Sequence, residues 1–382
     1  MPKWSDFGNI WTTLRDVDVN AIREEAERPL LIAIVGHGTA LADLSHLLSV
    51  SEDRYPAAGA SPLSLTAVEE ASPTDALRSA DLLIFAIDTR RSLTPAEATA
   101  FGRLDSLARP YAVVLLGPPG PQSGAPLPPT IAARAITLVD PQALDAADRL
   151  AEEVLRRLPS ELHLAAARRL PGVRAVYTRD LIGSTSFSNA SYALASGLPE
   201  QIPILSVPFA AADIVILTKN QAMMVYRIAL AYGAPPGFQE RIREVLPVIG
   251  GAFLWRQVAR SLVGLIPIWG LVPKVAVAYA GTYTTGIAAW RWFERGELVS
   301  ADQLRRISGE ALAMGRARAA EIIDRARQVS AGAAEQARTN SSGLWASLRE
   351  RLPRRRQREL PSGGQPGPDE DRGQRASDRT QK

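Results

Sequence analysis

Short apolar runs alternate with amphipathic helical patterns between residues 30 and 158. The runs predict five strands, which are Leu30–Val35, Leu63–Val68, Leu82–Ile87, Ala112–Leu116 and Ile136–Val139. The segments between them predict helices over Ala40–Leu48, Pro95–Leu107 and Pro141–Leu158. Apolar strands that alternate with helices form parallel sheets with both faces covered. The pattern therefore predicts an α/β domain, which we place at residues 29–165.

Residues 1–28 show the pattern of two amphipathic helices. The second is predicted from Asn20 to Glu27, just before Pro29. The first presents an apolar face made of Trp4, Phe7, Ile10, Trp11 and Leu14. Such a face either packs on the neighbouring domain or binds a membrane surface or a partner, and both hypotheses stay open.

Residues 166–300 predict a second, helical domain. Leu181–Pro199 contains no charge, but its Ser, Asn and Gly residues make it too polar to span a membrane. The segment "VILTKNQAMMVYRIALAYGAPP" predicts a helix. Thr218 and Gln221 are expected to form a capping box at its start. Gly233, followed by Pro235, is expected to end it. A further amphipathic helix, residues 301–340, is predicted to open at Ser300 with Gln303 as capping partner and to run to about Ala337.

The most apolar region is Ser261–Trp290, in which Lys274 separates uncharged runs of 13 and 16 residues. Each run is shorter than the roughly 20 residues that a membrane span needs. A membrane-embedded hairpin avoids this difficulty if its tip is formed by Pro267, Trp269, Gly270, Pro273 and Lys274. Both ends would face the cytoplasm, because they carry Arg256, Arg260, Arg291 and Arg295. The alternative is a buried helical pair in a soluble domain, which the row of small residues at Ala276, Ala280, Thr284 and Ala288 would also suit.

Residues 341–382 predict a disordered, basic tail, rich in Arg, Pro, Gly, Asp and Gln. The formal net charge of +4 lies entirely here, since residues 349–382 hold ten basic and six acidic residues. The candidate contacts for anionic lipid are Arg354, Arg355, Arg356 and Arg358, each contributing about 1 kcal/mol. A solvated tail is the alternative, and RNA binding has less support. The neutral body indicates no specific nucleic-acid partner.

Composition narrows the chemistry of the 382-residue chain. It contains no Cys and three scattered His, so disulfides and thiolate nucleophiles are excluded and a metal site is not predicted. One candidate loop remains, in "LLIAIVGHGTALADLSHLL", where a strand runs into Gly36, His37 and Gly38. A phosphate-binding loop requires Gly, Lys and Ser or Thr where this chain has Leu41, Ala42 and Asp43. We interpret the loop as vestigial, although the start of the next helix offers a weak anion site.

Two longer phrases carry a family resemblance. "ADLLIFAIDTRRSLTPAE" resembles the strand after the second switch of Era- and Obg-type small GTPases. Residues 207–296 are similar to domain-of-unknown-function family 697, a bacterial membrane-associated domain often fused to such GTPases. The matching phrases are "ILTKNQAMMVYRIALAYG", "VLPVIGGAFLWRQVARSLVGLIP" and "KVAVAYAGTYTTGIAAWRWFERGE". The resemblance implies a P-loop GTPase-like parallel sheet joined to a helical, membrane-associated domain.

The GTPase motifs themselves are lost. The lysine and the magnesium-binding hydroxyl of the phosphate loop are missing, and "TAVEEASPTDALRSAD" stands where Asp-x-x-Gly is expected. Gly117-Pro118-Pro119-Gly120 replaces the guanine-reading Asn-Lys-x-Asp. We therefore expect a degenerate GTPase-like fold with no cofactor and no catalytic residues.

The sequence thus predicts a non-catalytic adaptor or scaffold at the cytoplasmic face of the inner membrane, with lipid and an unidentified protein as partners. One alternative is a divergent GTP-binding protein or GTPase with unconventional nucleotide contacts. The other is a soluble cytoplasmic scaffold whose helices self-associate into a homo-oligomer.

Overall fold

The computed structural model describes residues 19–68, 75–118, 129–197, 206–234 and 271–321, together with residues 323, 324 and 328. The chain divides into two compact units, residues 1–325 and 326–382, and apart from residue 328 everything described belongs to the first. The predicted helix with Trp4 and Phe7 lies outside the described residues, and so do the predicted lipid contacts Arg354, Arg355, Arg356 and Arg358.

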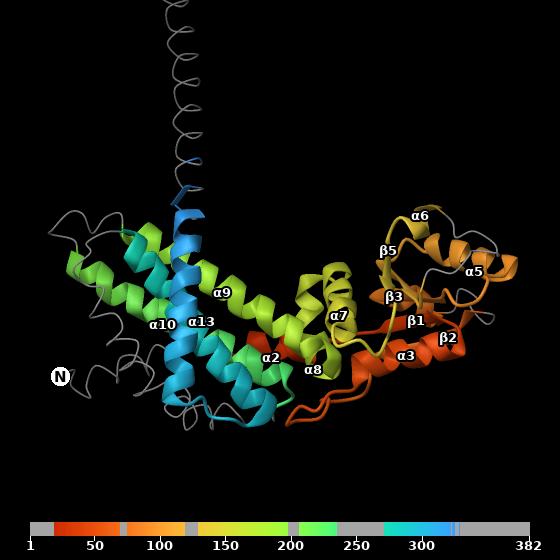
Figure 1. Cartoon of the computed structure of the whole chain (residues 1–382), viewed down its shortest axis with the longest axis horizontal. Helices are drawn as coiled ribbons and strands as arrows, with labels where there is room; N and C mark the ends of the chain where they lie inside the picture. The colour runs from red at the N-terminus through yellow and green to blue at the C-terminus, as the bar shows by residue number, and fades with distance from the viewer. Residues whose placement is uncertain are drawn as a thin grey trace, which may run out of the picture. The chain divides into compact units, whose positions relative to one another are not determined.

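A five-stranded parallel sheet forms one part of the first unit, with the strand order β2-β1-β3-β4-β5 (Figure 1). The strands are β1 (Ile32–Gly36), β2 (Leu63–Ala67), β3 (Leu82–Asp88), β4 (Tyr111–Leu116) and β5 (Ala135–Leu138). All five predicted strands are confirmed to within two residues at each end, and so is their parallel arrangement.

Helices cover both faces of this sheet, as the apolar strands predict. Alternate residues of a strand point to opposite faces, so Ile34 packs with α3 (Gly38–Ser49) and α7 (Ala146–Arg157). Val35 belongs to the opposite cluster, with α5 (Pro95–Asp105). Two short helices on that side, α4 (Asp75–Ser79) and α6 (Pro129–Ala132), were not predicted because one turn is too short to show a periodic pattern.

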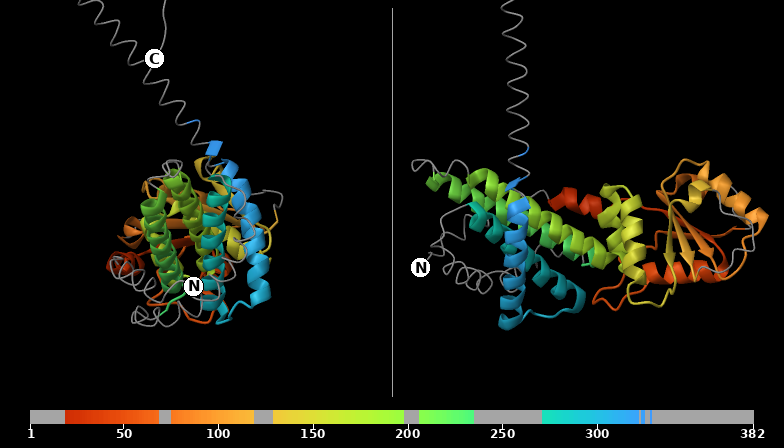
Figure 2. Two further views of the ribbon diagram at one scale, coloured as in Figure 1. Left: turned by 90° about the vertical axis from the view of Figure 1, so that its left-hand side faces the viewer. Right: turned by 45° about the horizontal axis from the view of Figure 1, so that its top comes forward.

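Helices form the other part of the first unit. They are α2 (Val19–Glu27), η2 (Ser160–Leu162), α8 (His163–Arg169), η3 (Pro171–Val173), α9 (Arg174–Gly197), α10 (Ser206–Ala231), α13 (Leu271–Arg295) and a helix over residues 301–321. The long helices α9, α10 and α13 pack against one another (Figure 2). One apolar cluster continues from the α3 side of the sheet into these helices, and it includes Ile34, Leu150, Leu164, Ile228 and Phe293.

The predicted capping box before the helix over residues 301–321 is confirmed. The backbone N–H of Ser300 donates to Gln303 Oε1 over 2.9 Å, and the Gln303 N–H donates to Ser300 Oγ over 3.3 Å. The same helix packs closely on α13, since a Cβ on Gly315 would lie 2.6 Å from the carbonyl oxygen of Ala276. The predicted end near Ala337 lies outside the described residues.

The predicted capping box at Thr218 is wrong. Helix α10 already begins at Ser206, so Thr218 lies inside it. The apolar residues that precede Thr218 belong to the same helix. Gln221 instead donates a hydrogen bond from Nε2 to Thr282 Oγ1 of α13 over 3.1 Å. The predicted end is confirmed, because Gly233 follows α10 with a positive φ of 77°.

Small residues let α13 approach its neighbours closely. Ala276, Ala280, Thr284 and Ala288 are all buried, and a Cβ on Gly286 would lie 2.6 Å from Ile182 of α9. Of the predicted hairpin tip, Pro273 and Lys274 lie in the first turn of α13, while Pro267, Trp269 and Gly270 lie outside the described residues. Within the described part of the chain, no helix combines the length and hydropathy needed to cross a membrane.

A buried polar layer joins α9, α10 and α13. Asn189 on α9 donates from Nδ2 to Thr282 Oγ1 over 2.9 Å and accepts a 2.7 Å bond from Asn220 Nδ2. Thr282 Oγ1 also accepts from Gln221 and donates to the Ala278 carbonyl over 2.9 Å. Because Asn189 and Thr282 are fully buried, each polar atom needs these partners, and the layer fixes the register of the three helices.

We predict that Thr282→Val lowers the free energy of unfolding by about 1–3 kcal/mol, because the Asn189 amide loses its buried acceptor. Thr285→Val is the matched control on the same helix, since Thr285 is half-buried and its hydroxyl donates to the Gly281 carbonyl within α13. Urea denaturation of both variants measures the difference. Equal losses in the two variants would contradict the role of the polar layer.

Candidate functional site

The carboxyl ends of β1 and β3 form the point where the chain changes direction across the sheet. From β1 the chain continues through α3 to β2 on one side, whereas from β3 it continues through α5 to β4 on the other. Open parallel sheets bind ligands at such a point. The predicted loop of Gly36, His37 and Gly38 lies here, beside residues 88–91 at the end of β3.

The two loop glycines differ in what their surroundings require. A Cβ on Gly36 would lie 2.2 Å from the carbonyl oxygen of Ala86 on β3, so strand packing alone requires glycine there. A Cβ on Gly38 would meet no atom within 4 Å. Between them, His37 is extended, with φ −96° and ψ 159°, and its carbonyl accepts the Leu41 N–H over 2.7 Å. The geometry is a tight turn from strand to helix.

Glu97, in the first turn of α5, is the centre of the polar contacts at this edge. Its side chain is 5% exposed, and Arg91 donates to it through Nη2 to Oε1 over 2.9 Å and Nη1 to Oε2 over 3.3 Å. The Thr94 N–H donates to Oε2 over 2.8 Å, which completes a capping box. His37 Nε2 contacts Oε1. Glu97 therefore ties the β3–α5 loop to the turn after β1.

A second ion pair lies beside the first. Arg90 donates to Asp88 from Nε over 2.8 Å, from Nη2 over 3.0 Å and from the backbone N–H over 2.9 Å. These hydrogen bonds lower the pKa of Asp88. The end of β4 is held next to this pair, because Thr89 Oγ1 donates to the Leu116 carbonyl over 2.9 Å. A Cβ on Gly117 would lie 2.8 Å from Arg90 Cγ.

Sequence reasoning missed four of these residues, Asp88, Arg90, Arg91 and Glu97. The phosphate-loop pattern does not include them, since they come from a different loop. The available signal was Thr94-Pro-Ala-Glu97 in "DTRRSLTPAE", which is a capping-box pattern. No group of three His, Asp or Glu side chains within the described residues is arranged to hold a metal ion.

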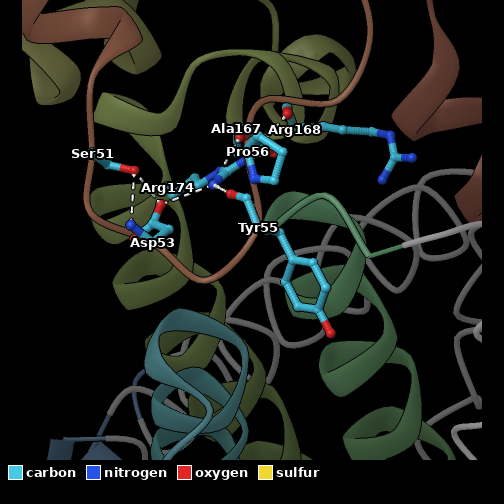
Figure 3. Close-up of polar contacts among 7 residues, drawn as sticks. All are labelled: Ser51, Asp53, Tyr55, Pro56, Ala167, Arg168 and Arg174. Carbon is cyan, nitrogen blue, oxygen red and sulfur yellow. Dashed lines mark hydrogen bonds and ion pairs between the residues drawn. The ribbon is translucent and has the colours of Figure 1, made fainter.

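Sequence reasoning also missed a second polar cluster, in which Arg174 on α9 holds the α3–β2 connection, residues 50–62 (Figure 3). Nη1 of Arg174 donates to Asp53 Oδ2 over 2.9 Å and to the Tyr55 carbonyl over 2.8 Å, and Nη2 donates to the Pro56 carbonyl over 2.9 Å. Its Nε donates to the Ala167 carbonyl over 3.2 Å. The side chain is 1% exposed, so the charge depends on these partners.

Other contacts dock the same connection on the ends of the helices. The Arg54 N–H donates to the Glu294 carbonyl of α13 over 2.7 Å, and the Ala58 N–H donates to the Arg168 carbonyl of α8 over 3.2 Å. The Arg54 guanidinium lies 5.1 Å from the centre of the Trp292 ring. The left-handed turn at Gly233 is also close, since a Cβ there would lie 2.8 Å from the Pro56 carbonyl oxygen.

The pKa of Glu294 is shifted by burial and by the charges around it at this junction. Partial burial raises its pKa above the ordinary value of 4.5, and the nearby Asp53 carboxylate raises it further, while Arg295 opposes both. The neighbouring Tyr232 is buried under the Arg174 guanidinium, at 5.5 Å from its ring centre, and burial raises its pKa as well.

Comparison with known proteins finds no match to this chain among protein families, curated proteins or solved structures.

We predict that Glu97→Ala lowers the free energy of unfolding by about 1–3 kcal/mol, because Arg91 and the Thr94 N–H lose a buried acceptor. Thermal and urea unfolding measure the change. Glu24→Ala, at an exposed position of α2, serves as the control and should change stability by less than about 0.5 kcal/mol. A loss no larger than that of the control would show that Glu97 does not organise the edge.

We predict that Glu294→Gln alters the pH dependence of stability. Because the folded state raises the pKa of Glu294, its contribution to stability is present at acidic pH and is lost as pH rises through the folded pKa. The wild type should therefore lose stability over the range above pH 4.5 relative to Glu294→Gln. Urea unfolding from pH 4.5 to 7.5 tests this, with the exposed Glu310→Gln as control. Parallel profiles for the wild type and Glu294→Gln would contradict it.

Proposed function

We propose that this protein is a non-catalytic adaptor, with a degenerate GTPase-like α/β domain of the Era and Obg type joined to a helical domain similar to domain-of-unknown-function family 697. The parallel sheet agrees with the first half of this proposal at the level of fold class. The family assignments rest on the sequence phrases.

The buried carboxylate of Glu97 carries the functional part of the proposal. It lies against His37, at the start of α3, where a phosphate loop would hold a triphosphate. A carboxylate at this place repels a phosphate group rather than attracting it. The two arginines of the neighbouring loop leave no net positive charge for a phosphate, because Arg91 pairs with Glu97 and Arg90 pairs with Asp88.

Calorimetry with GTP and GDP, each with Mg²⁺, tests this part on the full chain. We expect no heat of binding at protein concentrations that would detect a Kd of 100 μM, roughly −5.5 kcal/mol. Binding that Gly38→Trp abolishes would establish the alternative function of a divergent GTP-binding protein. In that case Arg90 and Arg91 would be the groups that had replaced the missing lysine.

We also propose attachment to the inner face of the membrane. It is supported by the sequence of Ser261–Trp290 and by the basic stretch with Arg354, Arg355, Arg356 and Arg358. Fractionation of cells without detergent is expected to recover the full chain with the membranes. Replacing these four arginines with Gln should reduce binding to vesicles that contain anionic lipid, and high salt should do the same. Recovery of the full chain in the soluble fraction would contradict the proposal.

A further inference from the structure

The α3–β2 connection is longer than its position in the sheet requires. It contains the thirteen residues between Ser49 and Leu63, whereas most connections in α/β units have about two to six. The extra residues leave the sheet and contact the ends of α8, α9 and α13. The additional residues of the α3–β2 connection therefore allow it to reach the helices.

Two neighbouring contacts, one from the start of α9 and one from η3 just before it, hold the connection and the end of α3. Arg174 binds Asp53 and two backbone carbonyls through its guanidinium. Two residues earlier, Gly172 of η3 packs on the last turn of α3, and a Cβ there would lie 2.0 Å from the Leu47 carbonyl oxygen. Because backbone touches backbone at this contact, α3 cannot slide along its axis unless the start of α9 also moves.

The opposite end of α3 is the carboxyl edge of the sheet. A helix of twelve residues is rigid and about 18 Å long, and in α3 its first residue follows His37 directly. His37 in turn contacts Glu97. One continuous set of contacts thus runs from Glu97 through α3 to Arg174 and the helices behind it.

Release of the connection would be a discrete event rather than a gradual one. Arg174 makes its hydrogen bonds from a fully buried position, and Ser51 Oγ donates to Asp53 Oδ2 over 2.7 Å, which fixes the carboxylate. A partly undocked connection would leave a buried guanidinium with only some of its acceptors, which is unfavourable. The connection is therefore either docked with all its bonds or detached.

From these contacts we infer that the α3–β2 connection is a coupling element, through which docking on Arg174 sets the position of α3 and hence the contact between His37 and Glu97. A partner that displaces the ends of α9 and α13 changes the carboxyl edge of the sheet. By thermodynamic linkage, a partner bound at that edge changes the docking of the connection in return.

Two backbone amides report on docking directly, because Arg54 and Ala58 donate to carbonyls of the helices. In full-length protein, Arg174→Lys keeps the charge but loses the planar fork that reaches several acceptors. We expect hydrogen exchange at these amides to accelerate about tenfold or more. The Leu41 amide should also accelerate, and the Hε1 resonance of His37 should shift at fixed pH.

Arg179→Lys is the matched control, since Arg179 lies on the same helix and pairs with Asp148 at an exposed position. It should change none of these signals. If Arg174→Lys does not fold, Asp53→Asn removes the ion pair and leaves the carbonyl bonds, and it should move the same signals by less. In the reverse direction, Glu97→Ala should accelerate exchange at Arg54 and Ala58.

The inference would be overturned if exchange at Arg54 and Ala58 became faster while the His37 resonance and the Leu41 amide did not change. The connection would then be attached to the helices without affecting α3. Unchanged exchange at Arg54 and Ala58 in the folded Arg174→Lys variant would overturn it as well. Nucleotide binding to the wild type does not decide this question, so the test stands apart from that of the adaptor function.

Discussion

The guanidinium of Arg174 lies inside the protein, where a charge is stable only with several well-placed acceptors. The α3–β2 connection supplies most of these acceptors, and the end of α8 supplies the rest. The apolar core continues across the same junction, from the strands to Phe293 of α13. The sheet and the helices are thus joined by the hydrogen bonds of Arg174 and by a shared apolar core.

At the carboxyl edge of the sheet, carboxylates and arginines are also paired with one another. Asp88 and Glu97 each hold one arginine, and Glu97 also binds the backbone of its own helix and the ring of His37. These contacts give the loops a defined shape through internal pairing.

Apolar periodicity was enough to predict the sheet, because the central strands β1, β3 and β4 are buried on both faces and carry few polar residues. It misplaced the start of α10, since Thr218 and Gln221 resemble a cap in sequence while Gln221 actually bonds to Thr282, sixty-one residues away. The cluster around Arg174 could not be predicted for the same reason. Arg174 and Asp53 are 121 residues apart, and nothing in the local sequence of either one indicates the other.

The long connection between α3 and β2 also limits how this protein can be divided or recombined. Its docking surface is formed by α8, α9 and α13, which come later in the chain than the sheet. A sheet excised from its helices would carry thirteen residues whose binding site had been left behind. In the reverse exchange, a foreign α/β domain grafted onto these helices would leave the Arg174 charge stranded unless residues 50–62 travelled with the graft. The sheet and the helices therefore have to be transferred together.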